Sequence, residues 1–434
     1  MLRRLCAAAL VVLLVPALTG CGFRELTRDR LLVWHDWPEA EAAILTELLR
    51  GYGEVDPDLE LIIEYVPADE IEQRFVDEVR SGFGPDVFIG ADAAALSAIV
   101  DEGAVHGISP AQAERYGFDE LDDRAMASMA VDDSQRGVPL AAFTDVMYVR
   151  HGVTAPADLD QIIELADQGQ SIAIPLDFFD IFWGIDAFEG TVFGDGDDVE
   201  PDEGFVRWME WLVEARRHPN VILDADYEML RDLFADGRID VFFGGSQELG
   251  TFRSALRIAD EDATANESDG AGEDESTTDG SDIEASTPTL TNIGDIMFGL
   301  RTLPGVDDET PGGFLDVEGM VLNQHTDNLN NSLALMEYLT NVPSQGRIAR
   351  AGVGRIPINP SVSIDPTISP MEAALVVQQR HTNVLPRQFQ HRQPELRAVA
   401  NDVYLQVTRG LLEPEDAALR LRELYEEATE ATDE

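Results

Sequence analysis

Acidic and aromatic side chains are the groups in this sequence that could do chemistry, and none of them falls into a catalytic motif. The sequence contains no lysine, which excludes a P-loop lysine and a lysine Schiff base. The patterns G-x-S-x-G and H-E-x-x-H are absent, and the seven histidines lack the spacing of metal ligands. We therefore expect no catalytic residue, no metal and no cofactor. A hydrolase that uses two of the many carboxylates stays open as an alternative.

Two groups of polar and aromatic residues follow apolar segments that are typical of buried strands. His35, Asp36 and Trp37 follow the segment 31–34, and Gly90 to Asp92 end the segment that begins at residue 86. Strand and helix patterns alternate along the chain, which indicates an α/β protein with a parallel sheet. Ligands bind beyond the carboxyl ends of such strands, so we expect both groups at the same mouth.

The spacing of apolar residues predicts the remaining elements. Strands are predicted at 31–34, 59–66, 86–90, 137–149, 171–175, 237–243, 295–304 and 314–322. Helices are predicted at 38–49, 69–81, 94–102, 159–166, 205–216, 230–234, 331–341, 370–379, 395–409 and 414–427. Trp208 and Trp211 share one helical face and are expected in the core. Residues 260–288 are acidic, contain no aromatic residue and lose the pattern, so we interpret them as an acidic disordered insertion.

The start of the chain resembles a bacterial lipoprotein signal peptide. Arg3 and Arg4 precede an apolar run over 5–17 that is too short to span a bilayer, and small residues lead from it to Cys21. The resemblance implies that residues 1–20 are removed and that Cys21 carries lipid such as palmitate.

An ordinary secretory signal is the alternative, and both predict an extracytoplasmic protein. With lipid on Cys21, the protein is anchored to the cell membrane through a tether over 21–30. Cys6 would leave with the signal, so no disulfide is expected.

The charge of the chain is strongly negative, with 83 acidic residues against 30 basic ones and a formal net charge of −53. The acidic residues are spread along the whole length, which favours a solvated, halophilic surface over one acidic partner site. No basic stripe is present to neutralise phosphates, so nucleic-acid binding is excluded.

Several weak motifs occur together in a characteristic order. They are Leu31-Val33-Trp34, Gly84-Pro85-Asp86-Val87-Phe88, Gly137-Val138-Pro139 leading to Tyr148, Phe234 to Arg238 leading to Phe243-Gly244-Gly245-Ser246, Gly312-Gly313-Phe314, and Tyr338-Leu339. In this order they resemble extracellular solute-binding proteins of ABC importers, in particular the maltose-binding-protein-like subgroup that binds sugars.

The resemblance implies an α/β, two-lobe, periplasmic-binding-protein-like fold of type II, in which each lobe is a mostly parallel sheet flanked by helices. Lobe one would comprise 30–140 and 304–354, and lobe two would comprise 145–298, with the insertion, and 359–434. A hinge of three crossings would lie near Ala141–Thr144, Leu300–Leu303 and Arg355–Ile358. The family is expected to act as a monomer that closes on a small-molecule solute and presents it to a membrane permease.

The resemblance also implies where solute contacts lie. The candidates are Asp36, Trp37, Glu39 and Asp92 in lobe one, Thr144 and Asp145 on the first crossing, Asp177, Phe178, Phe179, Trp183, Gly245, Ser246 and Gln247 in lobe two, and Phe314 and Asp316 on the returning strand. Trp37 and Trp183 follow strand ends in different lobes and could cover a solute from opposite sides. Trp34 is expected in the core, and Asp86 is expected to cap or pack.

The residue types at these positions suit a sugar or oligosaccharide. Aromatic rings cover the apolar C–H face of a pyranose, and carboxylates accept paired hydrogen bonds from its hydroxyls. Phe143 stands where many relatives carry a carboxylate, and the other candidates are heavily acidic, so a cationic solute such as a polyamine or quaternary amine stays open. A ligand-sensing lipoprotein that is not coupled to transport is a further alternative.

The distributed negative charge generates a prediction about salt. The melting temperature at neutral pH should rise as salt increases from dilute to molar concentration, because counterions screen repulsion among carboxylates. Thermal unfolding monitored by circular dichroism measures this. A melting temperature that is flat or falls over that range would contradict a halophilic surface.

Overall fold

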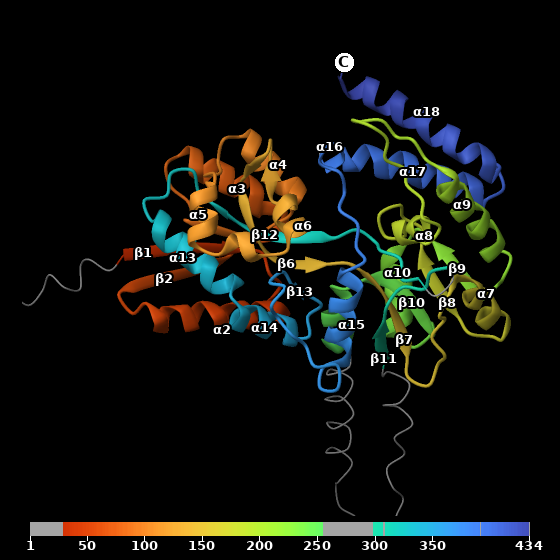
Figure 1. Ribbon diagram of the computed structural model, residues 1–434, viewed down its shortest axis with the longest axis horizontal. Helices are drawn as coiled ribbons and strands as arrows, with labels where there is room; N and C mark the ends of the chain where they lie inside the picture. The colour runs from red at the N-terminus through yellow and green to blue at the C-terminus, as the bar shows by residue number, and fades with distance from the viewer. Residues whose placement is uncertain (1–28, 255–297, 307–308, 391, 434) are drawn as a thin grey trace, which may run out of the picture.

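The computed structural model describes residues 29–254, 298–306, 309–390 and 392–433. The predicted signal peptide, Cys21, nearly all of the tether and the insertion over 260–288 lie outside the described residues. Figure 1 shows two lobes side by side along the long axis. No helix within these ranges is long and apolar enough to span a bilayer.

The first lobe is built on a six-stranded sheet with the order β13-β6-β12-β3-β1-β2. Its strands are β1 (Asp29–His35), β2 (Leu59–Tyr65), β3 (Val87–Ala91), β6 (Gly137–Phe143), β12 (Asp316–Leu322) and β13 (Ile356–Pro357). Its helices are α2 (Glu39–Val55), α3 (Ala68–Arg80), α4 (Ala93–Asp101), α5 (Pro110–Arg115), η1 (Phe118–Glu120), α6 (Asp123–Ser128), α13 (Leu329–Thr340) and α14 (Val342–Arg350). A small ribbon of β4 (Ala130–Val131) and β5 (Ser134–Gln135) precedes β6.

The second lobe is built on a five-stranded sheet with the order β11-β7-β10-β8-β9. Its strands are β7 (Asp145–Arg150), β8 (Ile172–Pro175), β9 (Val221–Asp224), β10 (Val241–Gly245) and β11 (Phe298–Arg301). Its helices are α7 (Leu159–Asp167), α8 (Phe182–Asp186), α9 (Glu203–Ala215), α10 (Tyr227–Ala235), α16 (Arg387–Gln390), α17 (Gln393–Thr408) and α18 (Pro414–Asp433). Residues 248–254 are also helical. Helix α15 (Pro370–Gln379) lies between the lobes and contacts both β11 and β13 (Figure 1).

As we expected, each sheet is mostly parallel: four of six strands in the first sheet and four of five in the second run in one direction, and the exceptions are β12, β13 and β7. Strands β2, β1 and β3 are parallel, with Asp29 opposite Leu59 and Val33 opposite Val87, and β9, β8 and β10 are parallel in the second lobe. Strand β12 runs antiparallel to β3 and β6, and β7 runs antiparallel to β10 and β11. The antiparallel strands are those that enter or leave a lobe at a crossing, so they do not follow the βαβ rule that makes neighbours parallel.

The crossings between the lobes differ from the expectation at one point. The first is short, since β6 ends at Phe143 and β7 begins two residues later. We expected the second near 300–303, but β11 pairs with β7 in the second sheet, Leu303 and Phe314 are buried in the second core, and β12 of the first sheet begins at Asp316. The crossing therefore lies after Phe314, because apolar residues before it bury against the second lobe.

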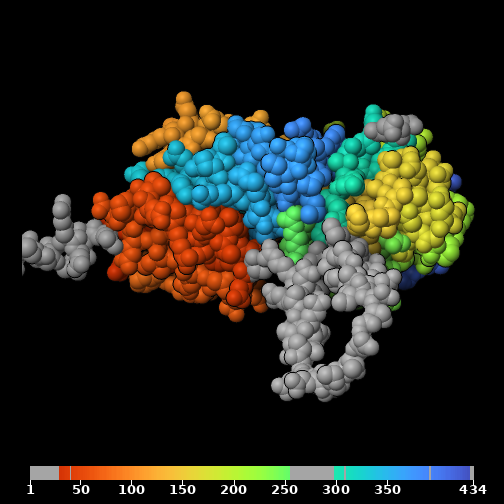
Figure 2. Space-filling view, turned by 90° about the horizontal axis from the view of Figure 1, so that it is seen from below, coloured from red at the N-terminus to blue at the C-terminus, as the bar shows by residue number. Residues whose placement is uncertain are grey.

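Figure 2 shows how the third crossing contributes to the join. The blue part of the chain, which includes α14 and α15, lies between the red first lobe and the yellow second lobe. Strand β13 pairs with β6 through Ile356 and Pro357, and the chain then passes to α15.

The hydrophobic core does not stop at the boundary between the lobes. On β7, Val146 and Tyr148 belong to the core cluster of the first lobe, while Met147 and Val149 belong to the second cluster. This alternation follows from the two-residue period of a strand, which sends successive side chains to opposite faces. One face of the second sheet therefore continues the core of the first lobe.

Aspartates fix the starts of several helices. Asp92, Asp158, Asp202 and Asp226 each precede a helix and accept a hydrogen bond from a backbone N–H of its first turn at 2.8–2.9 Å. Each such cap contributes about 1 kcal/mol. Part of the acidic composition thus serves local structure. The sequence reading missed α5 and α6, which have only six residues each and are too short to show a helical period.

Trp183 packs inside the second core. Its side chain is fully buried, its ring stacks on Phe243 at 5.0 Å between centroids, and Trp208 lies at 5.5 Å. Trp208 and Trp211 are also buried, as expected from their helical spacing.

This packing generates a prediction for Trp183→Ala. The change should lower the free energy of unfolding by about 3–5 kcal/mol, because it leaves a cavity among aromatic rings. Urea denaturation measures the loss. The control is Phe83→Ala, which removes a ring that is 71% exposed and should change stability by at most about 0.5 kcal/mol. Equal effects of the two changes would contradict the core assignment.

Candidate functional site

A cavity of about 470 Å³ lies between the two lobes. The first lobe lines it with the turn from β3 to α4, the end of β6 and the start of β12, and the second lobe lines it with the segment after β8 and the start of α17. Its lining includes the rings of Phe143, Phe179 and Phe314, the carboxylates of Asp92, Asp316 and Glu318, and the side chains of Gln247, Gln390, Gln393 and Arg397.

A second cavity of about 300 Å³ adjoins the first on the side of the second lobe. Thr144, Asp145, Asp180, Tyr227 and Gly245 line this cavity alone. Both cavities are lined by Phe179, Gln247, Phe314, Asp316, Gln393 and Arg397, so they form one hollow with two ends.

Eight of the predicted contact residues meet at this hollow. They are Asp92, Thr144, Asp145, Phe179, Gly245, Gln247, Phe314 and Asp316. Asp92 is held by its role as the cap of α4, where its carboxylate accepts a hydrogen bond from Ala95 N at 2.8 Å. The Asp145 carboxylate lies directly beside Gly313, where a side chain on residue 313 would displace it. The close approach of this carboxylate to the backbone explains why residue 313 is a glycine.

Trp37 does not line either cavity, although we expected it to cover a solute. Its ring is fully buried, and its indole N–H donates to Glu318 Oε1. The Arg355 guanidinium lies over the ring, 3.6 Å from the centroid. The end of the strand brings Trp37 toward the mouth, but its contacts with Glu318 and Arg355 hold the ring behind the residues that line the cavity.

Trp183, Phe178 and Ser246 are also placed in the interior. Phe178 and Trp183 are fully buried in the second core, because the segment after β8 folds its apolar side inward. Ser246 is fully buried and ties the first crossing to the third, since its N–H donates to Thr144 O at 2.8 Å and its hydroxyl donates to Gly354 O at 2.9 Å.

Three further acidic candidates lie outside the lining. Asp177 accepts from Asn401 Nδ2 at 2.7 Å and from Phe179 N at 3.0 Å, so it positions the ring of Phe179. Asp36 lies against Gly90, whose φ of +127° favours glycine. Glu39 is exposed in the first turn of α2.

A buried ionic cluster backs the first cavity. Arg355 is 5% exposed, donates to Glu318 Oε2 at 2.8 Å and pairs with Glu41. Burial lowers the pKa of Arg355 to about 9, which still leaves it protonated at neutral pH. Burial raises the pKa of the Glu318 carboxyl, with a further contribution from the Asp36 carboxylate, while the Trp37 N–H opposes the shift. The cluster fixes the strand that carries Asp316.

The carboxylates of the second cavity repel one another. Burial raises the pKa of Asp145 well above its usual range, and Asp180, Asp316 and Asp177 add to the shift. Burial and then Asp177 raise the pKa of Asp180 to about 7, while burial and then Asp92 raise that of Asp316 to about 6. The Asp316 side chain is reached by solvent through the cavity, but the surrounding protein still displaces much of its hydration. Arg397 lowers the pKa values of Asp180 and Asp316, but it offsets only part of the increase.

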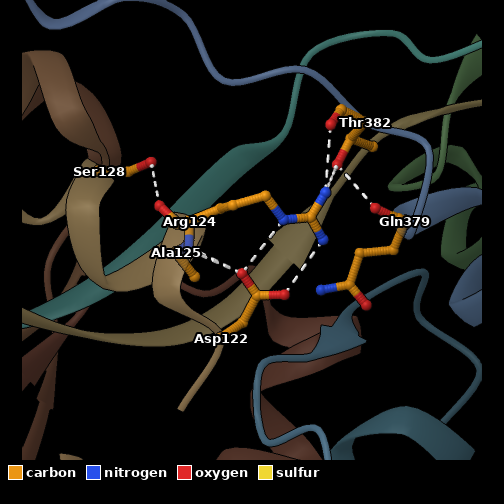
Figure 3. A network of polar contacts seen from close by, with 6 residues as sticks. All are labelled: Asp122, Arg124, Ala125, Ser128, Gln379 and Thr382. Carbon is orange, nitrogen blue, oxygen red and sulfur yellow. Dashed lines mark hydrogen bonds and ion pairs between the residues drawn. The ribbon is translucent and has the colours of Figure 1, made fainter. Parts of the chain in front are cut away.

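A polar bridge links α6 of the first lobe to the end of α15 and the residues after it, as Figure 3 shows. The Arg124 guanidinium on α6 donates to Thr382 O at 3.1 Å and to Thr382 Oγ1 at 3.0 Å, while Asp122 accepts from the same guanidinium at 3.1 Å. The Thr382 hydroxyl donates to Gln379 O at 2.7 Å, and the Ser128 hydroxyl donates to Arg124 O at 3.1 Å. Ser128 lines the first cavity, so the bridge supports its wall.

Sequence reasoning missed several lining residues, among them Asp180, Tyr227, Glu318, Gln393 and Arg397. Asp180 directly follows a segment whose aromatic residues were selected, and Glu318 is an isolated acid inside an apolar strand, so both carried a signal. Gln393 and Arg397 begin a C-terminal helix whose sequence shows only an amphipathic pattern.

Comparison with known proteins gives consistent matches. Residues 36–346 match the family described as bacterial extracellular solute-binding protein. The maltotriose-binding protein of Pyrococcus abyssi is 24% identical over 250 residues, which are 53% of this chain and 52% of that protein. The chain thus matches about half the length of this relative.

Solved structures of low sequence identity share the fold over nearly the whole chain. The GacH receptor of Streptomyces glaucescens is 16% identical with a TM-score of 0.67, covering 93% of this chain and 98% of that one. The maltotriose binding protein of Thermus thermophilus is 16% identical with a TM-score of 0.65 and coverages of 93% and 100%. The cyclic alpha-maltosyl-1,6-maltose binding protein of Arthrobacter globiformis is 13% identical with a TM-score of 0.71 and coverages of 93% and 99%.

The raised pKa of Asp180 generates a prediction about pH. The folded state holds this proton up to about pH 7, whereas the unfolded state releases it near pH 4. The free energy of unfolding of the protein therefore falls as pH rises from about 4 to about 7. Asp180→Asn removes this loss of stability, because asparagine does not ionise. Its melting temperature should exceed that of the unchanged protein at about pH 8, and the excess should shrink toward about pH 5. An excess that is equal at both pH values would contradict the shift.

Proposed function

Because this chain belongs to the bacterial extracellular solute-binding proteins, we propose that its two lobes capture a carbohydrate and deliver it to an ABC-type permease. The relatives named for maltotriose and cyclic maltosyl-maltose support a sugar or oligosaccharide as the solute. The solute lies in the hollow between the lobes and is released unchanged.

The observation that carries this proposal is the mixed lining of the hollow. Phe143, Phe179 and Phe314 offer aromatic rings, while Asp92 and Asp316 offer carboxylate oxygens in the same cavity. Rings stack on the apolar face of a pyranose, and carboxylates accept hydrogen bonds from hydroxyls at its edge. A hollow with two ends suits a chain of sugar units better than a single compact ring.

The proposed contact set combines predicted and newly identified residues. It consists of Asp92, Thr144, Asp145, Phe179, Gly245, Gln247, Phe314 and Asp316, together with Asp180, Tyr227, Gln393 and Arg397. Trp37 and Trp183 are not part of it, since both are buried behind the lining.

The proposal also covers the location of the protein and its oligomeric state. The lobes act as a monomer outside the cytoplasm, attached to the membrane by lipid on Cys21. The resemblance of the first twenty residues to a lipoprotein signal supports this anchor.

Phe179→Ala tests the proposal. A thermal-shift screen of oligosaccharides that includes maltotriose first identifies a carbohydrate that stabilises the fold. Isothermal titration calorimetry should then show that the change weakens binding of this carbohydrate by about 1–3 kcal/mol, because stacking and apolar burial are lost.

Phe83→Ala is the matched control, since it removes an exposed phenyl ring of the first lobe that is not among the lining residues. It should leave the affinity unchanged. A screen in which no carbohydrate shifts the melting temperature would overturn the proposed function, and an unchanged affinity in Phe179→Ala would remove the ring from the site.

A further inference from the structure

Three carboxylates of the second cavity lack a cationic partner. Asp145, Asp180 and Asp316 all line it, and within the described ranges none of them forms an ion pair. The one arginine of the lining, Arg397, pairs instead with Asp177 at 3.7 Å and lies over the Phe179 ring at 5.0 Å from its centroid. The cavity therefore gathers three carboxyl groups whose negative charge, when they ionise, is offset only in part by Arg397.

A second observation at the same cavity points to a ligand. Thr144 lines the cavity and is only 2% exposed, and its hydroxyl makes no hydrogen bond. Buried hydroxyls are nearly always paired, and an unpaired one costs about 1–3 kcal/mol. A polar group that enters the cavity beside Asp145 gives this hydroxyl a neighbour.

The arrangement does not suit a metal ion. In the described part of the chain, no three acidic, histidine or cysteine side chains are placed to hold one. An ammonium group has different requirements, because it donates hydrogen bonds at about 2.8 Å to oxygens spread around it.

We propose that the second cavity binds a protonated amine of the solute through the carboxylates of Asp145, Asp180 and Asp316. The inference rests on the proposed function only in placing the solute between the lobes. The amine could belong to an amino sugar or to an aliphatic polyamine, which share this chemistry. In either case the cavity selects for positive charge at one end of the solute, while Phe143 lines only the other end.

The experiment compares probes that differ at one nitrogen. The trisaccharide of glucosamine, its N-acetylated counterpart, maltotriose and spermidine are titrated into the full-length protein by calorimetry at about pH 6.5. The free amine should bind about tenfold or more tightly than the N-acetylated trisaccharide, because charge-assisted hydrogen bonds are lost on acetylation. Added salt should reduce this difference.

Variants assign the difference to the cavity. Asp180→Asn and Asp316→Asn should each weaken binding of the preferred amine about tenfold more than they weaken binding of its neutral counterpart. Asp198→Asn, which changes an exposed aspartate of the second lobe outside both cavities, is the matched control and should have no effect. Thermal unfolding confirms that each variant is folded.

The outcomes separate the two proposals. Preference for the glucosamine trisaccharide supports both, and preference for spermidine with no binding of any carbohydrate supports the amine cavity and overturns the carbohydrate proposal. Equal binding of amine and neutral sugars overturns the amine cavity and leaves the carbohydrate proposal standing. Binding of none of the probes overturns both.

Discussion

Arg355 is a charged side chain buried where the lobes join, and much of the hollow depends on how its charge is compensated. The guanidinium lies over Trp37, donates to Glu318 and pairs with Glu41, so it links the start of β13 to β12 and α2. An unpaired buried charge costs several kcal/mol, and loss of one partner would leave the others uncompensated. Because Glu318 lies two residues beyond Asp316 on the same strand, the cluster that satisfies the arginine also fixes a carboxylate of the lining. Charge pairing in the wall thus determines the position of side chains at the surface.

The crossings are joined to each other and to the lining. Ser246 follows the last strand residue of β10 and holds both the first crossing, at Thr144, and the third, at Gly354. Gly354 has a φ of +79° and lies so close to Ser246 that a side chain there would strike its carbonyl. Only glycine combines this backbone conformation with this approach. Thr144 lines the second cavity, so a group bound there lies next to the joint on which the lobes would rotate.

The sequence was sufficient for the alternating elements and for many residues at the mouth, because both depend on local pattern. Asp92 was found by its place after a strand and Phe179 through the family resemblance, and the structure brings both to one cavity. Trp37 and Trp183 satisfied the same rule and yet are buried. The difference for Trp37 comes from Arg355 and Glu318, which are about three hundred residues away in the chain, and no local pattern reports partners at that separation. The late second crossing escaped for the same reason, since long-range burial determines it.

The position of β12 has a consequence for the order in which the molecule can assemble. This strand lies between β3 and β6 in the middle of the first sheet, but it follows the whole second sheet in the chain. During synthesis the first half of the lobe therefore emerges with β3 and β6 unjoined, and their free edges stay open until residue 322 has been added. Of the two sheets, the N-terminal one is consequently the later to be completed, since β12 and β13 follow β11 in the chain. Its early strands must avoid pairing with other chains while the rest of the protein is made.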